Sequence, residues 1–203
     1  MTSFLHESRF RAVAGVLREA GARHILDLGC GDGDFIMHLL DDPQITAITG
    51  VEKDAGALER LRARLRGHPR ADRVDLLCAD ITSPPRAMPQ ADAVVLVEVI
   101  EHLDPARLQA LERVLLHDIA PPLAVVTTPN AEMNPLLGVK PGRMRHRDHR
   151  FEWDRARFRL WAQGLATRNG YALEVADIAG AHPRFGGSSQ MAVFAQITIQ
   201  SSV

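Results

Sequence analysis

The chain has 203 residues, of which 46% are hydrophobic and 24% charged, and its formal net charge is -1. This composition is ordinary for a globular domain, and the near-zero charge excludes the overall basic surface of a non-specific nucleic-acid binder. No apolar run approaches the roughly 18 residues that a membrane span needs, and the N-terminus lacks an apolar signal core. We therefore expect one soluble, cytoplasmic domain over residues 1–203, with Cys30 and Cys78 reduced.

Helical and extended segments alternate along the whole chain. Apolar residues at helical spacing predict helices at 3–20 (within an N-terminal helical region, 1–22), 34–40, 54–66, 104–116 and 154–169. Short apolar runs predict strands at 24–29, 45–51, 74–78, 93–97, 123–128, 171–178 and 192–199. The run 93–97 is apolar without alternation, which is typical of a strand buried on both faces of a parallel sheet. The pattern predicts a doubly wound α/β sheet that ends in a β-hairpin.

A long loop interrupts this alternation at 129–150. It is rich in cations and punctuated by proline and glycine. Loops of this length inside a compact domain are usually functional or disordered. We interpret 129–150 as a substrate and metal loop.

A glycine-rich turn follows the first predicted strand and opens a helix. It contains Asp27, Gly29, Gly31 and Gly33. Glu52 ends the second strand, where a carboxylate can bind ribose hydroxyls, and Asp80 follows the third, where it can accept from an adenine amino group. The turn has no Lys or Arg, so a sulfonium ligand fits it better than a pyrophosphate. The alternative is that the glycines serve only the turn and the two acids are surface caps.

The order of these signals resembles that of the Rossmann-like class I S-adenosylmethionine-dependent methyltransferases. The glycine motif of that class matches 27–33, and its two acids match Glu52 and Asp80. The resemblance spans nearly the whole chain. It implies S-adenosylmethionine as the cofactor and a seven-stranded, mostly parallel sheet with an antiparallel C-terminal hairpin, but it leaves the substrate open.

A second group of residues has the chemistry of a metal site. Glu98 lies at the carboxyl end of the fourth strand, and one helical turn would bring Glu101 and His102 to the same side. A fourth ligand would come from the later loop, from His146 or His149. The alternative is that Glu101 and His102 cap the next helix and that the loop histidines are merely solvated.

Three segments together resemble a more specific family, the small-RNA 3′-terminal 2′-O-methyltransferases, in their bacterial-type catalytic domain. These segments are the Glu-x-x-Glu-His stretch at 98–102, Thr-Thr-Pro-Asn at 127–130, and Arg-His-Arg-Asp-His-Arg-Phe-Glu-Trp at 145–153. The resemblance implies that the metal ligands are Glu98, Glu101, His102 and His149. It also leads us to expect His146 beside the reacting hydroxyl, so His146, His149 and Glu98 are the expected catalytic residues. We expect Phe151 and Trp153 to pack the loop against the last helix.

The resemblance implies a reaction and a substrate. The reaction is methyl transfer from S-adenosylmethionine to the 2′-hydroxyl of the 3′-terminal nucleotide of RNA. A divalent ion would stabilise the alkoxide, and the two Glu and two His ligands favour Mn²⁺, although Mg²⁺ could fill the site in the cell. If the ion takes both the 2′- and 3′-oxygens, only a free RNA end fits.

The long loop also carries the local basic patch that RNA binding would require. Its cations are Lys140, Arg143, Arg145, Arg147 and Arg150, against the single acid Asp148. We predict that they contact phosphates near the RNA end, the alternative being a solvated basic loop. The chain lacks the RNA-binding modules of eukaryotic members and the N-terminal domain of bacterial ones, so an RNA-repair or RNA-binding partner protein is expected.

Two other functions stay open from the sequence. One is a small-molecule O-methyltransferase that binds vicinal hydroxyls through a metal, against which the basic loop and the 148–153 stretch speak. The other is a non-catalytic subunit that binds RNA ends, against which the complete set of ligand residues speaks.

Overall fold

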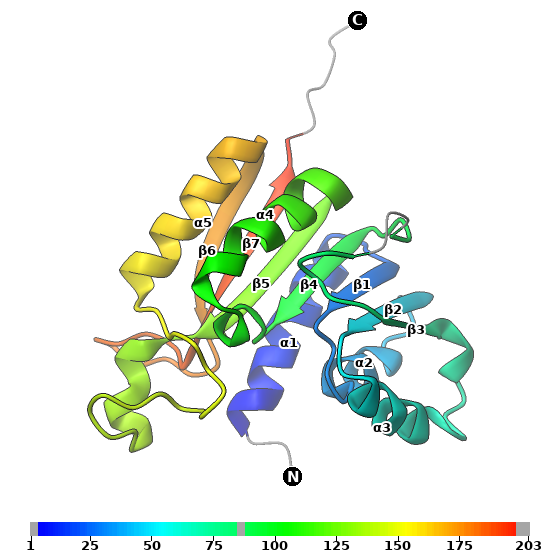
Figure 1. Cartoon of the computed structure of the whole chain (residues 1–203), viewed down its shortest axis with the longest axis horizontal. Coiled ribbons are helices and arrows are strands. Elements are labelled where there is room, and N and C mark those ends of the chain that lie inside the picture. Colours follow the sequence, from blue (N-terminus) through cyan, green and yellow to red (C-terminus); the bar gives the residue numbers. More distant parts are fainter. Residues whose placement is uncertain (1–3, 85–87, 198–203) are drawn as a thin grey trace, which may run out of the picture.

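The structure, a computed structural model, describes residues 4–84 and 88–197. A seven-stranded sheet with the order β3-β2-β1-β4-β5-β7-β6 runs through these residues (Figure 1). The strands are β1 (His24–Leu28), β2 (Ala47–Glu52), β3 (Val74–Cys78), β4 (Ala93–Val97), β5 (Leu123–Pro129), β6 (Tyr171–Ile178) and β7 (Ser189–Gln196). Only β7 is antiparallel to its neighbours, β5 and β6. This confirms the predicted α/β sheet and its C-terminal hairpin.

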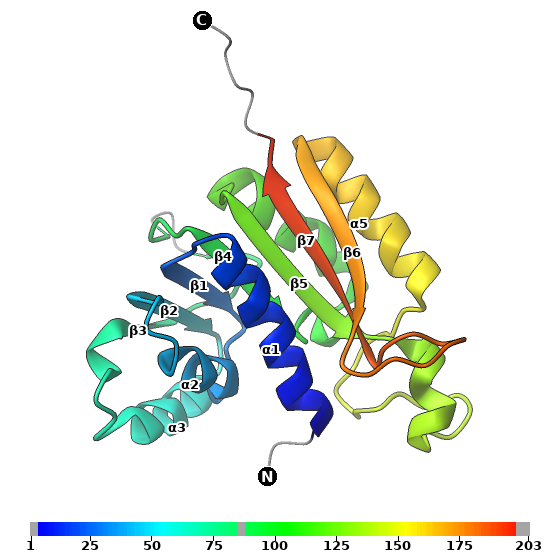
Figure 2. The same cartoon turned by 180° about the vertical axis from the view of Figure 1, so that it is seen from behind.

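Helices cover both faces of the sheet. They are α1 (Phe4–Glu19), α2 (Asp34–Leu40), α3 (Ala55–Leu65), α4 (Leu108–Arg113) and α5 (Arg155–Asn169). Helices α4 and α5 lie in front of the sheet in Figure 1, and α1, α2 and α3 lie on the face seen in Figure 2. Each layer has its own core: Phe35 and Leu61 pack in one, Phe158 and Phe194 in the other. Since β4 is covered on both faces, its uninterrupted apolar sequence is explained.

Three predicted elements differ from the structure by more than one residue at an end. The predicted strand 45–51 is β2, Ala47–Glu52. The predicted strand 192–199 is β7, which begins at Ser189 and ends at Gln196, and residues 198 and 199 lie outside the described residues, as does residue 3 of the first predicted helix. The predicted helix 104–116 is a 3₁₀ turn, η3 (Pro105–Arg107), then α4, then a π-helical segment, η4 (Val114–Ile119).

The long loop leaves and re-enters the fold at one place. An isolated bridge pairs Asn130 with Trp153, and the backbone N–H of Ala131 donates to the carbonyl of Trp153 at 3.0 Å. Gln190 of β7 donates its amide to the carbonyls of both Pro129 and Trp153. Residues 131–152 therefore form a closed loop with a fixed base. It contains a 3₁₀ helix, η5 (Ala131–Leu137), where a structureless loop was predicted.

The parallel strands end along one edge of the sheet. Leu28 of β1 pairs with Val51 of β2, and Val97 of β4 pairs with Thr127 of β5. The glycine turn, the turn after β4 and the 131–152 loop all start from this edge, which is where ligands bind in open α/β sheets. No helix among the described residues is both long and apolar enough to span a membrane.

Candidate active site

The glycine turn is held by Glu52. The backbone N–H of Gly31 donates to Glu52 Oε2 at 3.2 Å, and Oε1 of the same carboxylate accepts from the N–H of Asp54 at 2.9 Å. A Cβ on Gly31 would meet nothing within 4 Å, whereas one on Gly33 would lie 2.2 Å from Leu61 Cδ1. Gly33 is therefore required by packing, and Gly31 faces open space in which a ligand could approach the backbone.

Asp27 is the penultimate residue of β1, just before this turn, and is 2% exposed. Burial raises the pKa of its carboxyl to about 7, and the charge of Glu52 adds to the shift. A cationic ligand near both acids would lower the pKa of Asp27, because an opposite charge favours the ionised form.

Asp80 is already bonded within the protein. Its Oδ1 accepts from the backbone N–H and the hydroxyl of Thr82, and its Oδ2 accepts from Arg107 at 2.6 Å. Burial alone would raise the pKa of Asp80, but the bonds from Arg107 and Thr82 lower it to about 2. Asp80 lies where predicted, after β3. The predicted bond to an adenine amino group would have to be added to these contacts.

Glu98 is held in an unusual backbone conformation directly after β4. Its φ is 56°, in the left-handed region that costs a non-glycine residue energy. Thr127 donates its hydroxyl to Oε1 at 3.0 Å, while Arg9 of α1 lies 3.1 Å from Oε2. Burial raises the pKa of Glu98, and the Arg9 charge and the Thr127 bond partly offset this. In this structure the charge of Glu98 is therefore paired with that of Arg9.

Glu101 is completely buried in the turn η2 (Ile100–His102) that follows. Thr128 donates its hydroxyl to Oε2 at 3.0 Å, and Oε1 has no hydrogen-bond partner. Burial and the charge of Glu98 raise the pKa of Glu101 well above its ordinary value. An unpaired, buried carboxylate oxygen is costly, and it signals a missing cation or proton.

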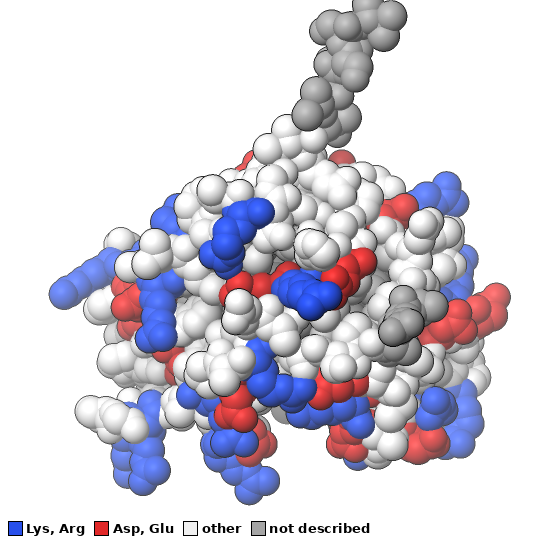
Figure 3. Space-filling view, turned by 45° about the horizontal axis from the view of Figure 1, so that its top comes forward, with Lys and Arg blue, Asp and Glu red and all other residues white. Residues whose placement is uncertain are grey.

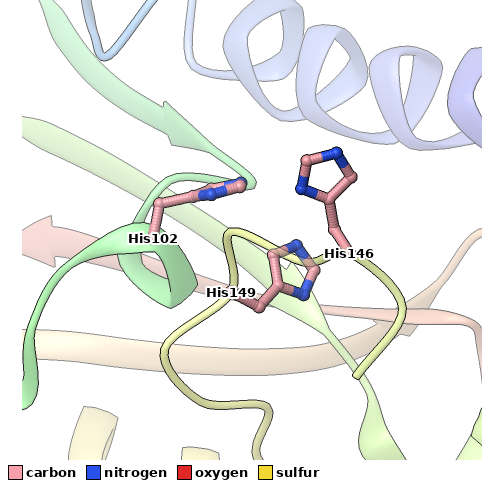
Figure 4. Close-up of side chains that lie close together, drawn as sticks. All are labelled: His102, His146 and His149. Atoms are coloured by element: carbon pink, nitrogen blue, oxygen red, sulfur yellow. The ribbon is translucent and has the colours of Figure 1, made fainter. Parts of the chain in front are cut away.

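Three histidines converge, one from η2 and two from the 131–152 loop (Figure 4). Candidate ligand atoms of His102, His146 and His149 lie within 4.8 Å of one another. The ring centres of His102 and His149 are 4.7 Å apart, and that of His146 lies 5.9 Å and 5.7 Å from them. Glu98 and Glu101 are not members of this group. The structure thus brings together two of the four predicted ligands, with His146 beside them.

The loop histidines differ in their surroundings. His149 is buried, and its Nδ1 lies 2.5 Å from Oε1 of the buried Glu152. His146 is exposed; its Nδ1 accepts from the backbone N–H of Asp148 at 3.3 Å and lies 3.7 Å from the Asp148 carboxylate. The backbone N–H of Arg150 donates to the Glu101 carbonyl at 2.7 Å, which fixes the loop over η2.

These residues fit a divalent cation. Glu101 supplies an unpaired oxygen, and the imidazoles lie close enough to share one ion. Burial lowers the pKa of His102, and the charges of His149 and His146 lower it further, which favours the neutral form that binds metals. A set of imidazole and carboxylate ligands suits Mn²⁺ or a similar ion. For Glu98 to join this set, its contact with Arg9 would have to change.

Most of the predicted RNA-contacting cations are free to meet a ligand. Lys140, Arg143, Arg147 and Arg150 are exposed. In Figure 3, Lys and Arg side chains project at the lower left, the side on which the 131–152 loop lies in Figure 1. Arg145 differs from the prediction: its guanidinium donates to Asn134 Oδ1 and to the carbonyls of Ser188 and Asn130. Its bonds fasten the base of the loop.

Sequence reasoning missed Arg9 and Glu152. Arg9 lies 3.1 Å from Glu98 but almost ninety positions before it in the chain. No local sequence pattern indicates a pair so far apart. Glu152 lies three residues after His149, and this spacing within 145–153 could have suggested it. The expected packing of Trp153 is confirmed, since it is buried and its ring centre lies 5.6 Å from that of Trp161 in α5.

Comparison with known proteins first defines the class. The methyltransferase domain family matches residues 26–117. An S-adenosylmethionine-dependent methyltransferase from Clostridium acetobutylicum superimposes with a TM-score of 0.68 over 92% of this chain and 90% of that chain. At 10% identity this likeness shows the fold alone. The fold and the glycine turn are those of a Rossmann-like methyltransferase domain.

More similar proteins define the family. The methyltransferase domain of bacterial CtHen1 is 35% identical, with a TM-score of 0.85 over 94% of this chain and 99% of that chain. The small RNA 2′-O-methyltransferase of Gallus gallus is 32% identical over 86% of this chain and 48% of that protein. The chain belongs to the family of small-RNA 2′-O-methyltransferases. It spans about half the length of the Gallus gallus relative.

Proposed function

We propose that the domain transfers a methyl group from S-adenosylmethionine to the 2′-hydroxyl of the 3′-terminal nucleotide of RNA, with a divalent metal ion. The observation that carries this proposal is the group formed by His102, His146 and His149, together with the buried and unpaired Oε1 of Glu101, the residue before His102. The substrate and the reaction follow from the name of the relatives, small RNA 2′-O-methyltransferase. The histidine group would supply the metal-binding chemistry.

The residues divide into three roles in this proposal. The cofactor would bind at Asp27, Gly29, Gly31, Gly33, Glu52 and Asp80. The ion would be held by Glu98, Glu101, His102 and His149. When bound, it would supply positive charge that lowers the pKa of an adjacent hydroxyl. His146 would accept the 2′-hydroxyl proton, and the Asp148 carboxylate, 3.7 Å from Nδ1, would stabilise the resulting imidazolium.

The exposed cations of the loop would hold the RNA end. Lys140, Arg143, Arg147 and Arg150 are exposed on the same loop as His146, and their charges would contact the last phosphates. No base-reading pocket is needed if the site demands two adjacent hydroxyls. Specificity for a free RNA end, against DNA and against a 3′-phosphate, would then follow from the 2′- and 3′-oxygens.

The test uses one short RNA in three forms, ending in a 2′,3′-diol, a 3′-deoxyribose or a 3′-phosphate. We expect labelled S-adenosylmethionine with Mn²⁺ to label only the diol, and the product to resist periodate, which cleaves free vicinal diols. Chelation by EDTA should abolish transfer, and Mn²⁺ should restore it. Equal labelling of the 3′-deoxy RNA would overturn the proposal, and so would transfer to a catechol in place of RNA. RNA binding without any transfer would favour a non-catalytic end-binding subunit.

The remaining expectations concern the setting of the domain in the cell. We propose a cytoplasmic protein whose 1–203 region acts as a single methyltransferase domain together with an RNA-repair or RNA-binding partner. The partner would supply RNA recognition, since the domain has only the local cations described above. Co-purification with tagged chain, with and without RNase, tests this, and activity of the isolated chain on physiological RNA at full rate would contradict it.

A further inference from the structure

Glu152 is bonded through both oxygens of its carboxylate. Its side chain is 3% exposed. Oε1 accepts from the backbone N–H of Arg145 at 2.7 Å and lies 2.5 Å from His149 Nδ1, while Oε2 accepts from the amide of Asn134 at 2.6 Å. One carboxylate thus joins three separate points of the 131–152 loop.

We infer that Glu152 is a positioning residue for the metal site: its Oε1 accepts the Nδ1–H of His149 and so fixes the ring with the Nε2 lone pair toward His102. This inference rests on the metal site of the proposed function. A carboxylate can only accept hydrogen bonds, and neutral imidazole has one N–H. At 2.5 Å, Nδ1 must therefore carry the hydrogen, which leaves Nε2 as the ligand atom.

The neighbours of Glu152 keep it from moving away from His149. Asn134 is itself fixed, because its Oδ1 accepts from Arg145 Nε at 2.6 Å. The Arg145 guanidinium is tied in turn to the carbonyl of Ser188, at 2.6 Å. A ligand whose supporting groups are this constrained is held in place before the ion arrives, which raises affinity.

Among the described residues, the other two histidines have no buried carboxylate as a partner. Asp148, the acid nearest to His146, has a side chain that is 60% exposed, and its oxygen lies 3.7 Å from the ring nitrogen. His102 is exposed, and its hydrogen bond goes to the backbone of Asp148. Of the three histidines, Glu152 therefore contacts only His149, and its replacement by glutamine should weaken binding of the ion.

The experiment measures Mn²⁺ binding to the full chain by calorimetry, without RNA, for wild type, Glu152→Gln and Asn134→Ala. We expect Glu152→Gln to weaken Mn²⁺ binding about 10- to 100-fold, the range found when such supporting groups are removed. S-adenosylmethionine binding should be unchanged. Asn134→Ala is the matched control, since it removes a bond to the same carboxylate but spares the His149 contact. It should weaken Mn²⁺ binding far less.

The outcomes separate this inference from the metal site itself. Absence of Mn²⁺ binding to wild type would overturn both. Tight binding to wild type and equally tight binding to Glu152→Gln would overturn only the role of Glu152, as would an equal loss in Asn134→Ala. If Glu152→Gln does not fold, ¹⁵N chemical shifts of His149 in the metal-free wild type decide: the Nδ1–H tautomer supports the inference, and the Nε2–H tautomer overturns it.

Discussion

Thr128 donates its hydroxyl to one oxygen of Glu101, at 3.0 Å, and the second oxygen of that carboxylate is left buried with no partner. The neighbouring Thr127 makes the same kind of bond to Glu98. Two consecutive residues at the end of β5 therefore orient the two acids, and neither threonine supplies the charge that the acids need. This arrangement leads to the first prediction.

Glu101→Gln should stabilise the metal-free protein while removing its response to metal. Burial and Glu98 raise the pKa of Glu101, so its charge is unfavourable without a cation. The neutral amide should raise the free energy of unfolding by about 1 kcal/mol or more. For a chain of this size, each kcal/mol raises Tm by roughly 2–4 °C. Calorimetric melts in EDTA and in excess Mn²⁺ test this. Thr128→Val serves as the control, because it keeps the charge. A Mn²⁺-induced rise in Tm retained by Glu101→Gln would count against Glu101 as a ligand.

Gly31→Ala should mainly reduce cofactor affinity, whereas Gly33→Ala should mainly reduce stability. Gly31 has a φ of 53° and open space at its Cβ position, so alanine there should cost about 1–2 kcal/mol of stability. We expect it to fold and to lose S-adenosylmethionine affinity, since the new methyl fills the space left for the ligand. At Gly33 the new Cβ would lie 2.2 Å from Leu61, so strain and overpacking add to about 2–5 kcal/mol. Thermal melts and cofactor titration distinguish them. Wild-type cofactor affinity in Gly31→Ala would place the cofactor elsewhere.

Asp27→Asn should stabilise the ligand-free protein more as the pH rises. Burial, with Glu52, raises the pKa of Asp27 to about 7, so the folded state holds a proton that the unfolded state releases near pH 4. The wild type therefore loses stability between about pH 4 and pH 7, by up to about 4 kcal/mol, and the asparagine variant escapes this loss. Urea unfolding at pH 5 and pH 8 measures the difference.

Asp92→Asn provides the control for this pH dependence. Backbone N–H groups of His24 and Arg23 lower the pKa of Asp92. A lowered pKa gives stability that is present above the unfolded value and lost only in acid. Its substitution should therefore cost the same at pH 5 and pH 8. An Asp27→Asn effect that is also constant over this range would show that Asp27 ionises normally.

Removing the exposed loop cations should flatten the salt dependence of RNA binding. We expect the triple variant Lys140→Gln, Arg143→Gln and Arg147→Gln to lose about 0.7 from the slope of log affinity against log salt for each phosphate contact removed. Fluorescence anisotropy with a short single-stranded RNA over a range of KCl measures this. The control variant, Arg66→Gln with Arg159→Gln, removes exposed cations on other elements and should keep the wild-type slope. An unchanged slope in the triple variant would show that these three cations do not contact RNA phosphates.

The strands inside the sheet were the most predictable part of the fold. The bounds of β3, β4 and β6 agree with the prediction, because their apolar runs end at turn residues. The start of β7 was missed, since its first residues, Ser189 and Gln190, are polar yet buried through hydrogen bonds that no periodicity reveals. The helical segment after β4 continues to Ile119 because no glycine or proline interrupts it before that point. It ends at Ala120, whose φ is 47°, and two prolines follow.

The site was predictable as a set of residue types at one edge of the sheet. The order of the strands forces Glu98, His102 and His149 toward that edge, and the structure places them there. The contact between Arg9 and Glu98, and the use of Arg145 to fasten the loop, depend on how α1 and β7 pack. Such long-range pairs are set by tertiary packing, which a single sequence does not display.

The closed base of the 131–152 loop has a consequence for how such domains diversify. Because Asn130 and Trp153 meet there, changes in length between them need not disturb the register of β5 and β7. Two of the histidines, their supporting glutamate and the exposed cations all lie on this one insert. Exchange of the segment between these two residues would thus replace the two loop histidines and the exposed cations together, while the glycine turn and η2 stay unchanged.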